Sequence, residues 1–465
     1  MDFIPLGDTE DIAASCHFLN LNGSGVVLDA GVDPRTDGPA SLPRFYRVHD
    51  DPNRFVDHVL VTHAHHDHVG CLPVFVKEFP HAMVHMTKPT RLLVDFLLPA
   101  SARLQERRRR EGTSQHDPIF TEADLQGLSH LYLMHGLEEP FDVTGLSGES
   151  DVEARFYSAG HILGSVGTEL TFREADGERR RVFYTGDTNL HPQSILPGGT
   201  YPDSTDVLIL ESTLGNDEEA AQTDRPTETK RFSETLARVL NRGGVALVPV
   251  FVMGRAQETL AMLGSLKDDG IIPRDVPIYT AGSMRAIASI YDKTRGISPR
   301  LDPDFRVFDV QQRRLPYSDE GKREALTGPS IIVVSSGMMF GPTLSNRIAR
   351  RIVENEKDAI LLVGYATEDS PAHRLKEAAE KGPGSGVMLA DGVGPQPVYC
   401  TVDSFRFTGH SNRDDLLGIV ERLSPEEVIL VHGETEAREW MAENIRMRHP
   451  EINVHRPAGG ERLTL

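Results

Sequence analysis

The chain has 465 residues, of which 39% are hydrophobic and 25% are charged, so it is long enough for two or three globular domains. It has no apolar run of membrane-spanning length, and its first residues lack the features of a signal peptide, so we expect a cytoplasmic protein with no membrane partner. The three cysteines, Cys16, Cys71 and Cys400, lie far apart, which excludes a disulfide framework and a Cys-x-x-Cys metal site.

The net charge of −20 argues against a nucleic-acid partner, because contacts to phosphate normally supply much of that affinity. The acidic excess is uneven, however. Residues 216–394 contain 25 acidic and 24 basic residues, so nearly all of the excess lies elsewhere in the chain. The middle segment is therefore the better candidate for a polyanion surface, while acidic surfaces elsewhere are equally consistent with a role in solubility.

Short apolar runs near the N-terminus each lead into polar residues that are able to bind metal. Residues 25–29 and 59–62 are of this kind and predict buried strands that present side chains at their C-terminal ends. Residues 89–110 have a helical pattern that closes with four consecutive arginines at 107–110. These arginines either face solvent at a helix end, where the helix dipole favours them, or contact phosphate.

From residue 245 onward, apolar strands alternate with helical stretches, and this alternation predicts a parallel α/β sheet. The strands are expected at residues 245–250, 276–280, 331–334 and 359–363. Stretches rich in glycine and proline at 382–386 and 392–395 mark a boundary after this sheet. Beyond the boundary we expect a strand at 427–432, a helix at 434–446 and a last strand at 452–455.

The strongest chemical signal is the sequence His63-Ala-His65-His66-Asp67-His68, which follows the predicted strand at 59–62. His63 and His65 alternate at a strand end, so their imidazoles share one side, while Asp67 and His68 reach a second position after the chain turns. His66 points elsewhere and is not expected to be a ligand. Imidazoles and carboxylates suit zinc, and two zinc ions can share a bridging carboxylate. The spacing therefore predicts a two-zinc site.

Further ligands have to come from distant segments. His161 and Asp187 both follow a predicted strand, and each is preceded by small residues that let the backbone approach an ion closely. Asp29 ends the strand at 25–29, where we expect it to accept a hydrogen bond from a liganding imidazole rather than to bind metal itself.

The ordered set Asp29, His63-x-His65-x-Asp67-His68, His161 and Asp187 resembles the first four motifs of the metallo-β-lactamase superfamily. Later motifs resemble its β-CASP nucleases, a group that includes ribonuclease J and the endonuclease subunit of the pre-mRNA cleavage and polyadenylation machinery. These motifs are Glu211-Ser-Thr213, residues 249–258, Ser335-Ser-Gly-Met-Met339, Phe407-Thr-Gly-His410 and Val431-His-Gly-Glu434.

The resemblance implies an α/β fold: a metallo-β-lactamase αββα sandwich with an inserted Rossmann-like β-CASP cap domain. The sandwich would be formed by residues 1–211 and 395–465, and the cap by residues 212–394.

The resemblance also implies a role for each matching residue. His63, His65, His161 and Asp187 would bind one zinc ion, and Asp67, His68, Asp187 and His432 would bind the other. Glu211, His410 and His432 match the first, second and third β-CASP motifs, and a histidine at the third is typical of members that cleave RNA.

Phosphodiester hydrolysis needs positive charge beside the phosphate, an acidified water and a proton for the leaving alkoxide. His410 is suited to donate that proton while Glu211 holds its other ring nitrogen. We therefore expect His410, Glu211 and Asp67 to take part directly in catalysis.

Substrate phosphates are expected in the cap, because ligands of open parallel sheets bind at the C-terminal ends of the strands. Arg255 and Gln257 begin a helix after the strand at 245–250, and Ser335, Ser336 and the Gly337 amide follow the strand at 331–334. Arg374 also matches the family pattern. For Arg255, the alternative is a buried structural salt bridge.

Three segments depart from the family pattern. The glycine-rich N-terminal loop is replaced by an acidic one at residues 7–13, an aspartate after the second motif is replaced by Asn412, and a glycine-rich segment is replaced at residues 366–371. Because of these departures, the sequence leaves open whether the protein acts as an endonuclease or as an exonuclease.

The expected function is hydrolysis of single-stranded RNA. The alternatives are a DNA nuclease, which His432 disfavours, and a small-molecule hydrolase such as a thioesterase or lactonase, which would lack the inserted domain. The third alternative is a catalytically silent RNA-binding or scaffold protein. The complete set of candidate metal ligands argues against it. The oligomeric state and the physiological RNA stay open.

Overall fold

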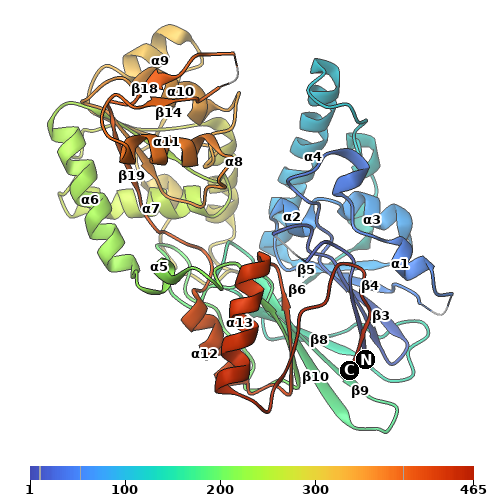
Figure 1. Ribbon diagram of the computed structural model, residues 1–465. Coiled ribbons are helices and arrows are strands. Elements are labelled where there is room, and N and C mark those ends of the chain that lie inside the picture. Colours follow the sequence, from blue (N-terminus) through green and yellow to red (C-terminus); the bar gives the residue numbers. More distant parts are fainter. Residues whose placement is uncertain (10–11, 53, 391) are drawn as a thin grey trace. The chain divides into compact units, whose positions relative to one another are not determined.

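The computed structural model describes residues 1–9, 12–52, 54–390 and 392–465. Within these ranges the chain divides into two compact units (Figure 1). Unit 1 comprises Met1–His191, Gly198–Ala221 and His410–Leu465, and unit 2 comprises Pro192–Pro197 and Gln222–Gly409. Glu10 and Asp11, which belong to the acidic N-terminal loop, lie outside the described residues.

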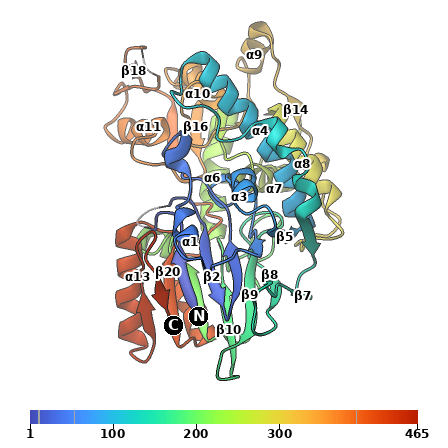
Figure 2. The same cartoon turned by 90° about the vertical axis from the view of Figure 1, so that its right-hand side faces the viewer.

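Unit 1 contains two mixed β-sheets. The strands of the first, in spatial order, are β22 (Leu463–Thr464), β1 (Asp2–Pro5), β2 (His17–Leu21), β3 (Ser24–Leu28), β4 (His58–Leu60), β5 (Met83–Thr87) and β6 (Tyr132–His135). Those of the second are β21 (Asn453–His455), β20 (Glu427–Val431), β11 (Val207–Glu211), β10 (Arg179–Tyr184), β9 (Val166–Arg173), β8 (Glu153–Ser158) and β7 (Pro140–Asp142). The pairing of β1 with β22 brings the two termini together, as both views show (Figures 1 and 2).

The two sheets of unit 1 pack face to face. Phe3, Leu28 and Leu60 of the first sheet share one buried apolar cluster with Phe156 and Ile209 of the second. Alternation of apolar side chains along these strands supplies that shared core.

Helices cover the outer faces of this sandwich. Alternate residues of β11 and β20 pack outward against α12 (Arg413–Leu423) and α13 (Thr435–Arg448), and α4 (Lys88–Glu111) contacts β5 and β6. The remaining helices of the unit are α1 (Tyr46–His49), α2 (His66–Val69), α3 (Leu72–Glu78), α5 (Glu218–Ala221) and the short 3-10 turns Gly38–Ser41, Glu122–Leu125 and Leu128–Leu131. The layers are thus α, β, β and α, as expected.

Unit 2 is built on a parallel sheet. Its strands, in spatial order, are β14 (Arg313–Arg314), β13 (Ile278–Thr280), β15 (Ser330–Val334), β12 (Val245–Pro249), β16 (Ala359–Leu362) and β19 (Thr401–Ser404). Every pairing in this sheet is parallel, and β17 (Gly386–Val387) and β18 (Gln396–Pro397) form a separate small ribbon. The predicted parallel α/β sheet is therefore confirmed.

Helices also cover the sheet of unit 2. Leu247 of β12 and Ile332 of β15 pack against α10 (Leu344–Ile352) and α11 (Pro371–Glu380), while α6 (Arg225–Asn241) contacts β12 and α7 (Arg255–Asp268) contacts β15. The other helices of unit 2 are α8 (Gly282–Lys293), α9 (Asp319–Ala325) and the 3-10 turn Val307–Asp309. Burial on both faces explains the unbroken apolar runs of these strands.

One expectation differs from the structure. The strand near 452–455 is followed by β22, so it is not the last. Unit 2 extends to Gly409, because β19 pairs with β16 in its parallel sheet. None of the helices in the described ranges has both the length and the hydropathy needed to span a membrane.

Candidate metal centre

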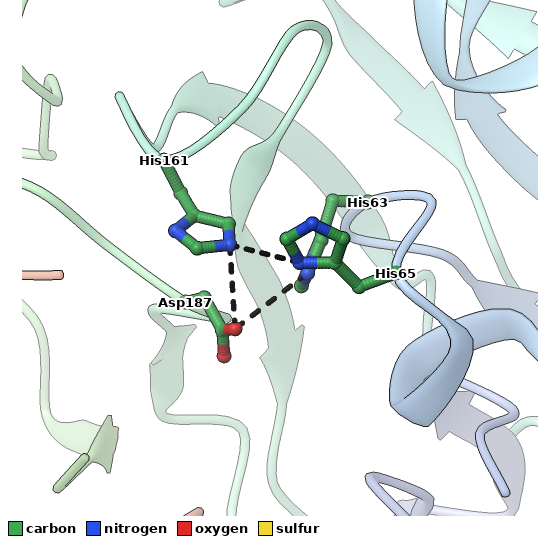
Figure 3. A group of neighbouring side chains, drawn as sticks. All are labelled: His63, His65, His161 and Asp187. Carbon is green, nitrogen blue, oxygen red and sulfur yellow. Dashed lines mark hydrogen bonds and ion pairs between the residues drawn. The ribbon is translucent and has the colours of Figure 1, made fainter. Parts of the chain in front are cut away.

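One group of candidate ligands lies where several strands of unit 1 end. His63 and His65 follow β4, His161 follows β8, and Asp187 follows β10 (Figure 3). His63 Nε2 and His161 Nε2 each lie 3.6 Å from Asp187 Oδ2, and His161 Nε2 lies 3.1 Å from His65 Nδ1. The structure therefore brings together four side chains that the sequence singled out.

The spacing of these atoms fits a cation. A metal ion bound at 2.0–2.1 Å in tetrahedral geometry separates neighbouring donor atoms by about 3.4 Å. The observed separations of 3.1 and 3.6 Å bracket that value. His63 Nε2 and Asp187 Oδ1 are buried without any hydrogen-bond partner in the described structure. A buried polar atom without a partner is unfavourable, and coordination of a metal ion would supply that partner.

A second group lies on the other side of Asp187 and consists of Asp67, His68 and His432. Asp187 Oδ1 is 3.2 Å from His68 Nε2 and 3.4 Å from His432 Nε2, whereas Asp187 Oδ2 faces His63 and His161. Asp67 Oδ2 lies 3.9 Å from both His68 Nε2 and His432 Nε2. One carboxylate thus faces two ligand groups, the arrangement that a pair of bridged cations requires.

The backbone explains why glycine precedes two of these ligands. Gly160 and Gly186, next to His161 and Asp187, have φ angles of +71° and +53°. Side-chain-bearing residues are strained in this left-handed region. At Gly186 an added Cβ would also lie 3.0 Å from Thr62, so glycine lets the Asp187 turn pack against the end of β4.

Charge within the site favours metal binding. Burial, and then the neighbouring His68, lowers the pKa of His63 well below its usual value, so its ring is neutral and has a free lone pair. Burial alone would raise the pKa of Asp187, but the histidines His432, His68 and His63 outweigh it and hold that pKa well below its usual value. A charged carboxylate surrounded by imidazole nitrogens is a suitable ligand set for zinc.

Asp29 is buried behind the second group. Its Oδ2 accepts hydrogen bonds from His68 Nδ1 at 2.8 Å and from the Tyr184 hydroxyl at 3.0 Å, and its Oδ1 accepts one from the Thr62 amide at 2.7 Å. Because a carboxylate can only accept, His68 Nδ1 must carry a proton, and this leaves His68 Nε2 free to face Asp187.

His410 and Glu211 form a pair beside the first ligand group. His410 Nδ1 lies 3.1 and 3.2 Å from the two Glu211 oxygens, and its ring centroid is 4.5 Å from that of His161. Burial disfavours the charged ring, but the charge and hydrogen bond of Glu211 outweigh burial and raise the pKa of His410 to about 9. The pair therefore holds a proton on His410 at neutral pH.

Glu211 has the contacts of an orienting residue. It is fully buried at the end of β11, and its oxygens accept hydrogen bonds from the Thr188 amide and from Thr213. These bonds fix the carboxylate toward His410.

The cap residues singled out by the sequence lie where strands of unit 2 end. Arg255 opens α7 after β12, and Ser335, Ser336 and Gly337 follow the neighbouring parallel strand β15. The Ser336 hydroxyl is buried without a hydrogen-bond partner in the described structure.

Two further cap residues make mainly backbone contacts. The Gln257 side chain is fully buried and bonds to the Gly254 amide at 3.0 Å and the Val252 carbonyl at 3.2 Å, which fixes the start of α7. Arg374 donates to the carbonyls of Asp369 and Met388 at 2.6 and 3.3 Å.

Three family models match successive parts of the chain. They are the metallo-beta-lactamase superfamily at residues 10–211, the Beta-Casp domain at 256–375 and the Zn-dependent metallo-hydrolase RNA specificity domain at 395–457. The chain belongs to the β-CASP branch of the metallo-β-lactamase superfamily.

Curated β-CASP relatives match along nearly the whole chain. An endoribonuclease, YSH1, of Candida glabrata is 27% identical over 93% of this chain and 54% of its own length. An RNase J-like protein of Methanocaldococcus jannaschii is 29% identical over 92% of this chain and 91% of its own. The cleavage and polyadenylation specificity factor subunit 3 of Dictyostelium discoideum is 27% identical over 100% of this chain and 57% of its own. The chain thus spans only about half the length of two of these relatives.

Among solved structures, a protein of unknown function from Enterococcus faecalis has the same fold. It is 13% identical, with a TM-score of 0.56 over 100% of this chain and 99% of the other.

The departure of Asn412 from the β-CASP pattern has a local explanation. Asn412 is the N-cap of α12, and its side chain accepts hydrogen bonds from the amides of Asp414 and Asp415 at 2.9 and 3.0 Å. Aspartate and asparagine perform this role about equally well. The substitution therefore preserves the N-cap of α12.

Three side chains at the site were not predicted from the sequence: Ser15, Thr62 and Tyr184. The Ser15 hydroxyl lies 3.1 Å from His432 Nδ1, and Thr62 Oγ1 lies 3.1 Å from His63 Nδ1. Thr62 and Tyr184 adjoin motifs and could have been found from that position, but Ser15 lies in a stretch without any metal-binding pattern.

Proposed function

We propose that this chain is a zinc-dependent ribonuclease that hydrolyses phosphodiester bonds of single-stranded RNA at a two-metal site. The observation that carries the proposal is the His410–Glu211 pair beside two ligand groups that share Asp187. The printed names of the curated relatives, an endoribonuclease and an RNase J-like protein among them, support RNA as the substrate.

Each ligand group would hold one ion. His63, His65, His161 and Asp187 would bind the first, and Asp67, His68, His432 and Asp187 the second. When bound, two zinc ions supply positive charge to the phosphate and acidity to an attacking water.

The side chains of the chain supply the proton transfers. Asp67 is partly exposed, and we assign to it the orientation of the attacking water. His410, protonated and held at Nδ1 by Glu211, would donate its Nε2 proton to the leaving oxygen as the phosphorus–oxygen bond breaks. Without that proton the leaving group would depart as an alkoxide, which is a poor leaving group at neutral pH.

Substrate phosphates outside the reacting bond are assigned to Arg255, Ser335, Ser336, the Gly337 amide and Arg374. Their place at the carboxyl ends of β12 and β15, and at the start of α11, supports this assignment. The buried Ser336 hydroxyl lacks a partner in the described structure, as expected of a group that binds a ligand.

The test uses 5′-end-labelled single-stranded RNA and DNA of the same sequence. We expect the purified protein to cleave the RNA, to lose activity with a chelator and to regain it with added Zn²⁺. Preferential cleavage of the DNA would replace the proposal by a DNA nuclease. If the protein cleaves neither polymer but hydrolyses a thioester or a lactone, the proposed function would be replaced by that of a small-molecule hydrolase.

A further inference from the structure

A cationic surface on α4 lies outside the metal centre. Arg103, Arg107 and Arg110 are spaced by four and three residues, so they share one face of the helix, and all are exposed. With Glu106 and Glu122 they line a groove of about 590 Å³. In a chain with a net charge of −20, such a cluster of arginines is unexpected.

Three of the six arginines on α4 are not neutralised by a carboxylate in the described residues. Arg91 pairs with Asp95 at 2.8 Å. Arg103 pairs with Glu122, and Arg109 pairs with Asp117 at 2.9 Å. Within the described ranges, Arg107, Arg108 and Arg110 have no carboxylate partner. A favourable interaction with the helix dipole explains arginines in the last turn, Arg108 to Arg110, but not Arg103 and Arg107, which precede that turn.

The arginine face begins close to the metal-binding motif. Ser101 of α4 lies 3.4 Å, Oγ to Nε2, from His66, which stands between the ligands His65 and Asp67. An α-helix rises 1.5 Å per residue, so Arg103 to Arg110 lie roughly 3 to 14 Å along the helix from that contact. Figure 1 shows α4 as the long helix that extends away from the sheets of unit 1.

We propose that Arg103, Arg107 and Arg110 bind the phosphate backbone of the RNA strand that extends away from the metal centre. Grooves that bind single strands without sequence preference are lined with positive charge along the path of the backbone. The proposal rests on the proposed ribonuclease function, and it adds a binding surface outside the cleavage site.

The test compares two double variants with equal loss of charge. Arg107→Gln/Arg110→Gln removes two arginines that line the groove, and Arg108→Gln/Arg109→Gln removes two that do not. Binding of a 20-nucleotide and a 4-nucleotide fluorescent RNA is measured by anisotropy in a chelator, so that binding is separated from cleavage. Circular dichroism checks that both variants are folded.

We expect Arg107→Gln/Arg110→Gln to weaken binding of the 20-nucleotide RNA roughly tenfold, and to reduce the slope of log K against log salt by about 1.4. The 4-nucleotide RNA and the control variant should change less than about twofold. The proposal would be overturned if both variants weakened binding of the 20-nucleotide RNA equally, or if neither variant weakened it. It would also be overturned if the wild type bound no RNA. Normal RNA binding in the chelator by a protein that cleaves no RNA after Zn²⁺ is added back would instead refute the ribonuclease function alone.

Discussion

His68 Nδ1 donates a 2.8 Å hydrogen bond to Asp29 Oδ2, and His68 Nε2 lies 3.2 Å from Asp187 on the opposite side of the ring. Asp29 itself has a φ angle of +62°, a conformation that is costly for a residue with a side chain. The fold therefore holds Asp29 in an unfavourable backbone conformation. In that position its carboxylate fixes the orientation of the candidate ligand His68.

Replacing Asp29 by alanine is expected to weaken zinc binding by about 10–100-fold, because His68 loses the partner that orients its ring. The measurement is a competition titration with a chromophoric chelator. Asp57→Ala is the matched control, since Asp57 is also buried but accepts hydrogen bonds from the amides of Gly25 and Leu146, away from the ligands. Equal zinc affinity in the Asp29→Ala and Asp57→Ala proteins would contradict the orienting role.

The number of bound ions tests the sharing of Asp187. We expect about two zinc ions per wild-type chain, about one for Asp67→Ala and fewer than one for Asp187→Ala, since only Asp187 faces both groups. Elemental analysis after dialysis against metal-free buffer gives the count. An Asp67→Ala protein that retains two ions would remove Asp67 from the ligand set.

The pKa of His410 tests the Glu211 contact. In the zinc-free protein the ring should stay protonated below about pH 9 and lose its proton as the pH rises through that value. Glu211→Gln removes the charge that raises this pKa, so the titration should move to lower pH. Nuclear magnetic resonance of histidine-labelled protein follows the titration, with His410→Gln to assign the signal. An unchanged titration in Glu211→Gln would rule out the proposed coupling.

The N-cap role of Asn412 predicts contrasting effects of two substitutions. Asn412→Asp should leave the free energy of unfolding almost unchanged, whereas Asn412→Ala should lower it by about 1 kcal/mol. Urea unfolding measures the difference. If Asn412→Asp were as destabilising as Asn412→Ala, capping would not explain this departure from the β-CASP pattern.

Much of the site was predictable because its signals are local. His63 to His68 follow one strand, and His161 and Asp187 each follow a glycine whose positive φ the structure explains. The apolar runs likewise predicted the strands of both units. Ser15 was not predictable, because its contact with His432 joins positions 417 residues apart.

The extent of unit 2 likewise depends on a pairing between distant parts of the chain. The glycine- and proline-rich stretch before residue 395 marks the small ribbon of β17 and β18, and β19 then adds to the parallel sheet. The pairing of β19 with β16 depends on the tertiary structure and has no short-range sequence signal. Loop composition alone therefore does not show that unit 2 extends to Gly409.

The most direct test of the central claim is single-turnover RNA cleavage by His410→Ala, with zinc content measured on the same sample. We predict that this variant retains about two zinc ions but cleaves about 10²–10⁴-fold more slowly than the wild type, because the leaving oxygen lacks its proton donor. Cleavage at the wild-type rate with both ions bound would contradict the assignment of His410 and, with it, the proposed mechanism.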